Sequence, residues 1–170
     1  MNGPIALTGI TAHSSICSSS PDTGPLSGTG TGKTGAYAIS MIQGVEQNKT
    51  IQGLVLAPTR ELAMQITDEF KKFAKFTGVR AVSIYGGQGM GVQLQALKHG
   101  VEIIVATPGR LIDHLKQGSI ELNDIKYVVL DEADTMLDMG FIDDIRFILE
   151  LTPVNKVMSL FSATMPPEIL

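Results

Sequence analysis

The sequence is short of several residue types, and each shortage excludes a class of protein. It holds one cysteine, Cys17, and no tryptophan among 170 residues. One cysteine excludes a disulfide framework, and a single cysteine with three histidines argues against a dedicated zinc site. No apolar run reaches the ~18 residues of a membrane span, and the first residues lack the basic-then-apolar order of a signal peptide. The composition predicts a soluble protein of a reducing compartment, the cytoplasm, without a membrane partner.

Positive charge is also scarce. Thirteen Lys and Arg stand against seventeen Asp and Glu, which leaves a net charge of −4. A protein that holds nucleic acid mainly through bulk positive charge has the opposite balance. Any contact with nucleic acid must therefore be made by a local group of residues.

Short apolar runs alternate with segments of helical period from residue 53 onward. The runs cover residues 54–57, 79–85, 101–106, 127–130 and 157–161, and the helical stretches cover 34–45, 61–76, 92–97, 111–116 and 142–151. This alternation predicts an α/β fold, a doubly wound and mostly parallel sheet with helices on both faces. Three glycines, Gly78, Gly100 and Gly118, are placed as helix stops.

The helix predicted over residues 61–76 is amphipathic. Its apolar face carries Leu62, Ile66, Phe70, Phe73 and Thr77, and the opposite face carries Lys71, Lys72 and Lys75. A lysine face of this kind is more often a solvated helix surface than a binding site.

Residues 1–26 differ from the remainder of the chain. They are rich in Ser, Thr, Gly and Pro, have Asp22 as their one charged side chain, and show no helical period. The sequence therefore predicts an atypical N-terminal segment over residues 1–26 and one domain over residues 27–170, which agrees with ~150 residues per domain.

Polar residues follow every apolar run. In an open parallel sheet the ligand lies beyond the carboxyl ends of the strands, where helix N-termini point outward. The segments at these ends are Pro58-Thr59-Arg60-Glu61, Gly86-Gly87, Thr107-Pro108-Gly109-Arg110, Asp131-Glu132-Ala133-Asp134 and Ser162-Ala163-Thr164. Five such turns indicate that one edge of the sheet is a binding surface.

The segment Ser27-Gly28-Thr29-Gly30-Thr31-Gly32-Lys33-Thr34 has the composition of a phosphate-binding loop. Its glycines let backbone N–H groups converge on phosphate oxygens, Lys33 supplies a charge for the phosphates, and the Thr34 hydroxyl can ligate Mg²⁺. Ser27 stands where the general pattern has glycine, and a Gly-Lys-Thr triplet also occurs by accident in flexible loops. The loop by itself leaves an ordinary turn as the alternative.

Asp131 and Glu132 follow a buried run and supply the second half of a nucleotide site. One carboxylate serves the Mg²⁺ shell, and its neighbour orients or deprotonates an attacking water. The alternative is the solvated acidic start of a helix, where such residues are favoured. Together with the upstream loop, the pair favours hydrolysis of a nucleoside triphosphate.

The turn from Thr107 to Arg110 has two interpretations. Threonine as N-cap and proline at the first helical position simply start a helix. The same turn offers N–H groups and a guanidinium to a backbone phosphate. Gly86-Gly87 alone favours turn chemistry, and the histidines show no catalytic spacing.

Six motifs occur in order at compatible spacing: SGTGTGKT, PTRELA, Gly86-Gly87, TPGR, DEAD and SAT. This series resembles the N-terminal RecA-like domain of DEAD-box RNA helicases over residues 27–170. The resemblance implies a RecA-like P-loop fold, ATP and Mg²⁺ as cofactors, and RNA as partner. It also implies RNA-dependent ATP hydrolysis coupled to local strand separation.

The resemblance further implies a role for each matching residue. Nucleotide binding would fall to Ser27, Gly28, Thr29, Gly30, Thr31, Gly32, Lys33 and Thr34, with Thr34 and Asp131 on the metal. Glu132, Asp131 and Lys33 would be catalytic, and Asp134, Ser162 and Thr164 would couple the nucleotide state to RNA binding. The sugar-phosphate backbone of RNA, without base readout, would meet Pro58, Thr59, Arg60, Gly87, Thr107, Gly109 and Arg110.

Two departures from the family pattern leave other functions open. The family carries an aromatic residue and an adenine-reading glutamine upstream of the loop, whereas here no glutamine precedes Gln43 and no aromatic residue precedes Tyr37. The chain stops soon after SAT, so we expect the second RecA-like domain to be missing and the isolated domain to have little or no activity. The alternatives are a non-catalytic RNA- or partner-binding module with a disabled nucleotide site, and an unrelated phosphate-loop ATPase.

Overall fold

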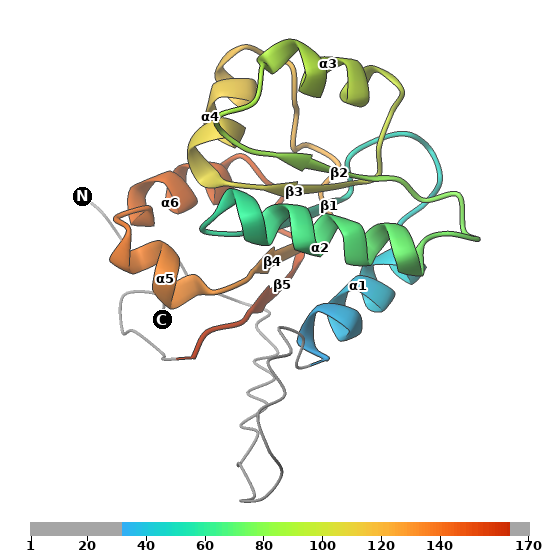
Figure 1. Cartoon of the computed structure of the whole chain (residues 1–170), viewed down its shortest axis with the longest axis horizontal. Coiled ribbons are helices and arrows are strands. Elements are labelled where there is room, and N and C mark those ends of the chain that lie inside the picture. Colours follow the sequence, from blue (N-terminus) through green and yellow to red (C-terminus); the bar gives the residue numbers. More distant parts are fainter. Residues whose placement is uncertain (1–31, 164–170) are drawn as a thin grey trace, which may run out of the picture.

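The computed structural model describes residues 32–163, in which a parallel sheet lies between two layers of helices (Figure 1). The strands are β1 (Gly53–Leu56), β2 (Ala81–Ile84), β3 (Ile103–Ala106), β4 (Tyr127–Leu130) and β5 (Val157–Leu160). Their order is β2-β3-β1-β4-β5, and every adjacent pair is parallel. The predicted segment 1–26 lies outside the described residues.

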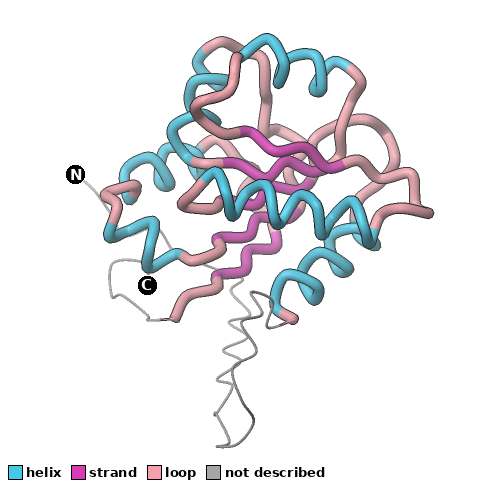
Figure 2. The backbone as a smooth tube through the Cα atoms, in the orientation of Figure 1, coloured by secondary structure: helices cyan, strands magenta, loops and turns pink. Residues whose placement is uncertain are grey.

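The helices of this part of the chain are α1 (Lys33–Gly44), α2 (Arg60–Phe73), α3 (Met90–Lys98), α4 (Pro108–Lys116), α5 (Ala133–Asp138) and α6 (Ile142–Glu150). The first two contribute to one core cluster, and α4, α5 and α6 contribute to the other, while α3 packs beside β2. Figure 2 shows the strands running between these layers. The predicted doubly wound arrangement is confirmed. None of these helices is both long and apolar enough to cross a membrane.

Continuous apolar runs are needed because each central strand is covered on both faces. Leu54 and Leu56 of β1 belong to one core cluster, whereas Val55 and Ala57 belong to the other, and all four are fully buried. Successive side chains of a strand point to opposite faces. A strand with helices on both sides therefore has no solvent-facing position for a polar residue.

Local signals determine where the helices begin and end. The N–H of Leu62 donates to Thr59 Oγ1 at 3.2 Å at the start of α2, and Pro108 is the first residue of α4. The predicted stops at Gly100 and Gly118 are confirmed, because each directly follows the C-cap of its helix in a left-handed conformation, with φ of 75° and 66°. Gly78 is also left-handed, with φ of 77°, but it does not stop α2, which has already ended at its C-cap Ala74. A side chain at any of these glycines would be strained.

Two helix predictions need correction. The helix predicted to reach residue 76 ends at Phe73, whose side chain is exposed, and its buried residues are Ala63, Ile66, Thr67 and Phe70. Small Ala63 and Thr67 face the core because α2 lies close to α1 and the sheet. Helix α5 was not predicted, since six residues are too few to show a helical period.

Candidate functional site

A cavity of about 270 Å³ opens at the carboxyl edge of the sheet, beyond β4 and β5. Its lining consists of Lys33, Asp131, Glu132, Asp134, Thr135, Phe161, Ser162 and Ala163. Lys33 begins α1, whereas Asp131 follows β4, so the fold brings two distant motifs together. The lysine predicted to bind phosphate and the carboxylate predicted to hold metal therefore line one cavity.

Both carboxylate oxygens of Asp131 accept hydrogen bonds. The Tyr37 hydroxyl donates to Oδ2 at 2.9 Å, and the Glu132 N–H donates to Oδ1 at 3.0 Å. Burial raises the pKa of Asp131, while these two hydrogen bonds and the Lys33 ammonium act in the opposite direction. The carboxylate is oriented and partly desolvated before any ligand arrives, which is the condition for a well-defined metal ligand.

Glu132 has an unusual backbone conformation. Its φ of 50° and ψ of 51° lie in the left-handed region, which is costly for residues other than glycine. Burial raises the pKa of its side chain, and the negative charges of Asp131 and Asp134 raise it further. A carboxyl with a raised pKa is better matched to proton exchange with water near neutral pH.

Asp134 connects the acidic segment with the segment after β5. Its N–H donates to Ser162 Oγ at 3.2 Å, and its Oδ2 accepts from the Ala163 N–H at 3.1 Å. The structure thus brings together Asp134 and Ser162, two of the three residues predicted to couple the nucleotide state to RNA binding. Thr164, the third, lies outside the described residues.

The N-terminus of α1 faces this region with Lys33 as its first residue. Gly32 precedes the helix in a left-handed conformation with φ of 69°, and among the described residues no side chain caps this terminus. No acidic residue lies in the first turn, so the positive end of the helix dipole is not neutralised there. This arrangement favours an anion. The predicted loop residues Ser27, Gly28, Thr29, Gly30 and Thr31 lie outside the described residues.

The residues predicted to face RNA lie at the same edge of the sheet, in the turns that follow β1, β2 and β3. Arg60 Nη1 lies 3.7 Å from the place a Cβ would take on Gly87, and Arg110 Nη1 donates to the Gln88 carbonyl at 2.8 Å. The turns after β1 and β3 therefore both approach the glycine turn after β2. The list is completed by Pro58, Thr59, Thr107 and Gly109, which flank the starts of α2 and α4.

Arg110 is less available to a phosphate than its motif suggests. Its side chain is 16% exposed, and Nε lies 3.5 Å from Asp113 Oδ2 in addition to the bond to the Gln88 carbonyl. By contrast, the Arg60 side chain is 55% exposed, and within residues 32–163 its ion pair is with its neighbour Glu61 alone. Arg110 thus holds the glycine turn in place, which its sequence motif did not predict.

A buried polar network beneath this surface was not predicted. Gln93 Nε2 donates to the Tyr85 carbonyl at 2.8 Å, and its Oε1 lies 3.0 Å from His114 Nε2, which therefore carries the hydrogen. His114 Nδ1 lies 2.8 Å from Ser119 Oγ. Burial lowers the pKa of His114, and Arg110 lowers it further. No spacing rule joins Gln93 to His114, since they meet only where α3 and α4 pack together.

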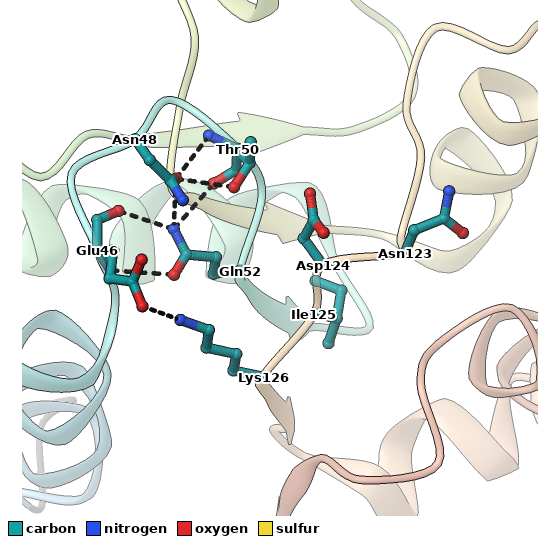
Figure 3. Close-up of a pocket in the computed structure, with 8 residues that line it drawn as sticks. All are labelled: Glu46, Asn48, Thr50, Gln52, Asn123, Asp124, Ile125 and Lys126. Carbon is teal, nitrogen blue, oxygen red and sulfur yellow. Dashed lines mark hydrogen bonds and ion pairs between the residues drawn. The ribbon is translucent and has the colours of Figure 1, made fainter.

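A larger cavity, about 360 Å³, lies at the opposite edge of the sheet (Figure 3). Its side chains mostly bond to one another: Gln52 Nε2 donates to Asn48 Oδ1 at 2.7 Å, and Lys126 pairs with Glu46 at 2.7 Å. These contacts fasten the loop before β1 to the start of β4. No residue predicted from the motifs lies in this cavity.

A parallel sheet whose carboxyl edge combines a lysine at a helix N-terminus with an acidic pair after a buried strand is typical of a RecA-like P-loop domain. The sequence model of the DEAD/DEAH box helicase family matches residues 14–170, and the chain belongs to that family. The match begins inside the segment 1–26 that the composition sets apart.

Curated relatives and solved structures agree with this assignment. The chain is 48% identical over 143 residues to "ATP-dependent RNA helicase DeaD" of Haemophilus influenzae, and 51% identical over 141 residues to "DEAD-box ATP-dependent RNA helicase RhpA" of Helicobacter pylori. These matches cover 83% of this chain but 23% and 29% of the relatives, so the chain spans about a quarter of their length.

Two crystal structures resemble the fold closely. One is a DEAD box protein from the hyperthermophile Methanococcus jannaschii, with a TM-score of 0.78 and 46% identity, covering 84% of this chain and 39% of that one. The other is a hypothetical ATP-dependent RNA helicase from Sulfolobus tokodaii, with a TM-score of 0.75 and 41% identity, covering 84% and 41%.

Proposed function

We propose that this chain is the ATP- and RNA-binding half of an RNA helicase, which couples ATP hydrolysis to local separation of RNA strands when joined to a second RecA-like domain. The observation that carries the proposal is the cavity shared by Lys33 and Asp131. Two similar proteins are named ATP-dependent RNA helicases, which supports the substrate class. The cytoplasmic location expected from the composition stays a prediction.

The residues present fit a magnesium-bound nucleoside triphosphate. Mg²⁺ prefers oxygen ligands, and at nucleotide sites it is held by one or two carboxylates together with substrate phosphates. Within residues 32–163 no three His, Cys, Asp or Glu side chains form a dedicated metal cluster, whereas Asp131 offers an oriented carboxylate. We assign Asp131 and the Thr34 hydroxyl to Mg²⁺, which when bound would neutralise charge on the phosphates.

Different residues of the chain bind the phosphates and activate the attacking water. Lys33 and the N–H groups at the start of α1 bind phosphate oxygens, with the loop residues that precede them. Glu132 orients the attacking water and accepts its proton, a role for which its raised pKa is suited. Both residues line the cavity with Asp131, so the groups that bind and the groups that react act at one place.

RNA binding is proposed for the adjacent part of the same edge. Its turns present exposed Arg60, the glycine turn at Gly87 and the start of α4, which suit sugar and phosphate groups and provide no base readout. Asp134 and Ser162, together with Thr164, would transmit the nucleotide state to this surface through the chain after β5.

Titration calorimetry with Mg-ATP on the full 170-residue chain tests the proposal. We expect binding heat that disappears in Lys33→Ala and persists in the matched variant Lys98→Ala, whose lysine is exposed at the end of α3. Equal heat in the two variants would refute a nucleotide site at Lys33.

We also expect hydrolysis near background, because an arginine finger of the kind a second domain supplies contributes ~10³–10⁵ in rate. Turnover of ~1–10³ per second by this chain alone would refute the need for that domain.

A further inference from the structure

Asp131 is held by a tyrosine that none of the sequence motifs includes. Tyr37 lies on α1, one helical turn after Lys33 and Thr34, and its side chain is buried. Its hydroxyl donates to Asp131 Oδ2 at 2.9 Å and lies near the Thr34 side chain. One phenol therefore approaches both side chains to which we assign the metal.

Aromatic packing fixes the position of the Tyr37 ring. The ring centroids of Phe70 and Phe161 lie 6.1 Å and 5.3 Å away, with planes tilted by 45° and 43°. Phe161 also lines the cavity that contains Asp131. A buried ring packed against two others cannot swing away from its partner without opening the core.

The two hydrogen bonds on Asp131 act as a pair. The Glu132 N–H holds Oδ1 and the Tyr37 hydroxyl holds Oδ2, so rotation of the carboxylate would break both bonds. The donor of the backbone bond, Glu132, is the residue next to Asp131 in sequence, so it moves together with Asp131 in any local motion of the chain. The bond from Tyr37 instead ties the carboxylate to α1, the helix that carries Lys33 and Thr34.

We propose that Tyr37 is a positioning residue for the magnesium site, which sets the orientation of the Asp131 carboxylate and its separation from Thr34 without contacting metal or nucleotide. The inference rests on the proposed function of the same site. Removal of a group that orients a metal-binding side chain lowers metal affinity by ~10–100-fold. A ring that only filled space in the core would give no such effect when its hydroxyl alone is removed.

The experiment compares binding of a non-hydrolysable β,γ-imido ATP analogue in Mg²⁺ and in EDTA, by calorimetry on the full chain. In Tyr37→Phe we expect the gain in affinity caused by Mg²⁺ to fall by about tenfold. If the gain in the unmodified chain is less than about tenfold, it should vanish in this variant. The affinity in EDTA should stay unchanged. The matched variant is Tyr127→Phe, which removes a hydroxyl from β4, the strand that leads to Asp131. We expect it to leave both affinities unchanged.

A double-mutant cycle separates positioning from packing. In an Asp131→Asn background the Tyr37→Phe change should have no further effect on the Mg²⁺ gain, whereas a packing role would lower the gain equally in both backgrounds. Thermal unfolding followed by circular dichroism verifies that every variant is folded. An undiminished gain in Tyr37→Phe overturns the inference and leaves the nucleotide site intact. Absence of Lys33-dependent binding by the unmodified chain overturns the proposed function and, with it, this role for Tyr37.

Discussion

Replacement of Gln93 by leucine tests whether the buried network stabilises the turn after β2. Gln93 is buried and bonds to the Tyr85 carbonyl and to His114. Leucine leaves both of these groups without their partner, at a cost of about 1–3 kcal/mol each, and regains about 2 kcal/mol through its own apolar burial. The expected loss in the free energy of unfolding is therefore about 2 kcal/mol.

The companion variant His114→Leu shows whether the loss comes from unpaired groups. In the double variant Gln93→Leu/His114→Leu the imidazole N–H is gone, so neither leucine leaves the other group unpaired. The double variant should therefore lose at least about 1 kcal/mol less unfolding free energy than the sum of the losses in the two single variants. Urea unfolding followed by far-ultraviolet circular dichroism measures all three, since the chain has no tryptophan. Strictly additive losses would refute the assigned contact between Gln93 and His114.

The buried His114 also makes the stability of the folded protein depend on pH. Burial, assisted by Arg110 and opposed by Asp113, lowers the pKa of His114 in the folded protein below the 6.5 of the unfolded chain. In the window below pH 6.5 the unfolded chain binds more protons, so stability is lost as the pH falls through that window. His114→Leu should flatten this part of the stability curve, and His99→Leu, at the exposed end of α3, should not. Identical slopes in the two variants would contradict the assignment.

Two further predictions concern the exposed edge. Arg60→Ala should weaken binding to single-stranded RNA and reduce the slope of log affinity against log salt by about 1, whereas Arg146→Ala, of similar exposure (56%) on α6, should change neither. Filter binding at several salt concentrations measures both, and equal slopes would contradict an RNA surface at Arg60. Glu132→Gly should be about 1–2 kcal/mol more stable than Glu132→Ala in urea unfolding, because its φ of 50° suits only glycine without strain. Equal stability would show that no strain is stored there.

Most of the architecture was predictable because its signals are local. Each of the five apolar runs matches a strand, although β1 begins one residue before its run, at Gly53, and the stops at Gly100 and Gly118 follow from a conformation that glycine adopts at little cost. The errors are also physical. Helix α5 is too short to show a period, and α2 turns Ala63 and Thr67 inward because neighbouring elements approach closely, which an apolar pattern does not encode.

The candidate site was predictable to the extent that its motifs follow strands. Asp131 was expected at the carboxyl edge because it follows a strand, and Lys33 was expected beside it because its phosphate-loop motif is the other half of a nucleotide site; the two residues line one cavity. The interior contacts of Arg110 were not predictable, because the guanidinium of a TPGR turn gives no sign of whether it meets solvent or the Gln88 carbonyl.

By itself, the sequence determined the alternation of strands and helices, the helix starts at Thr59 and Pro108, and the edge on which polar groups gather. These features depend on residues within a few positions of one another. Only the tertiary structure decided that Tyr37 meets Asp131 and that Gln93 meets His114. Such contacts depend on how each helix seats on the sheet and on its neighbours, and that is set by side-chain packing throughout the domain.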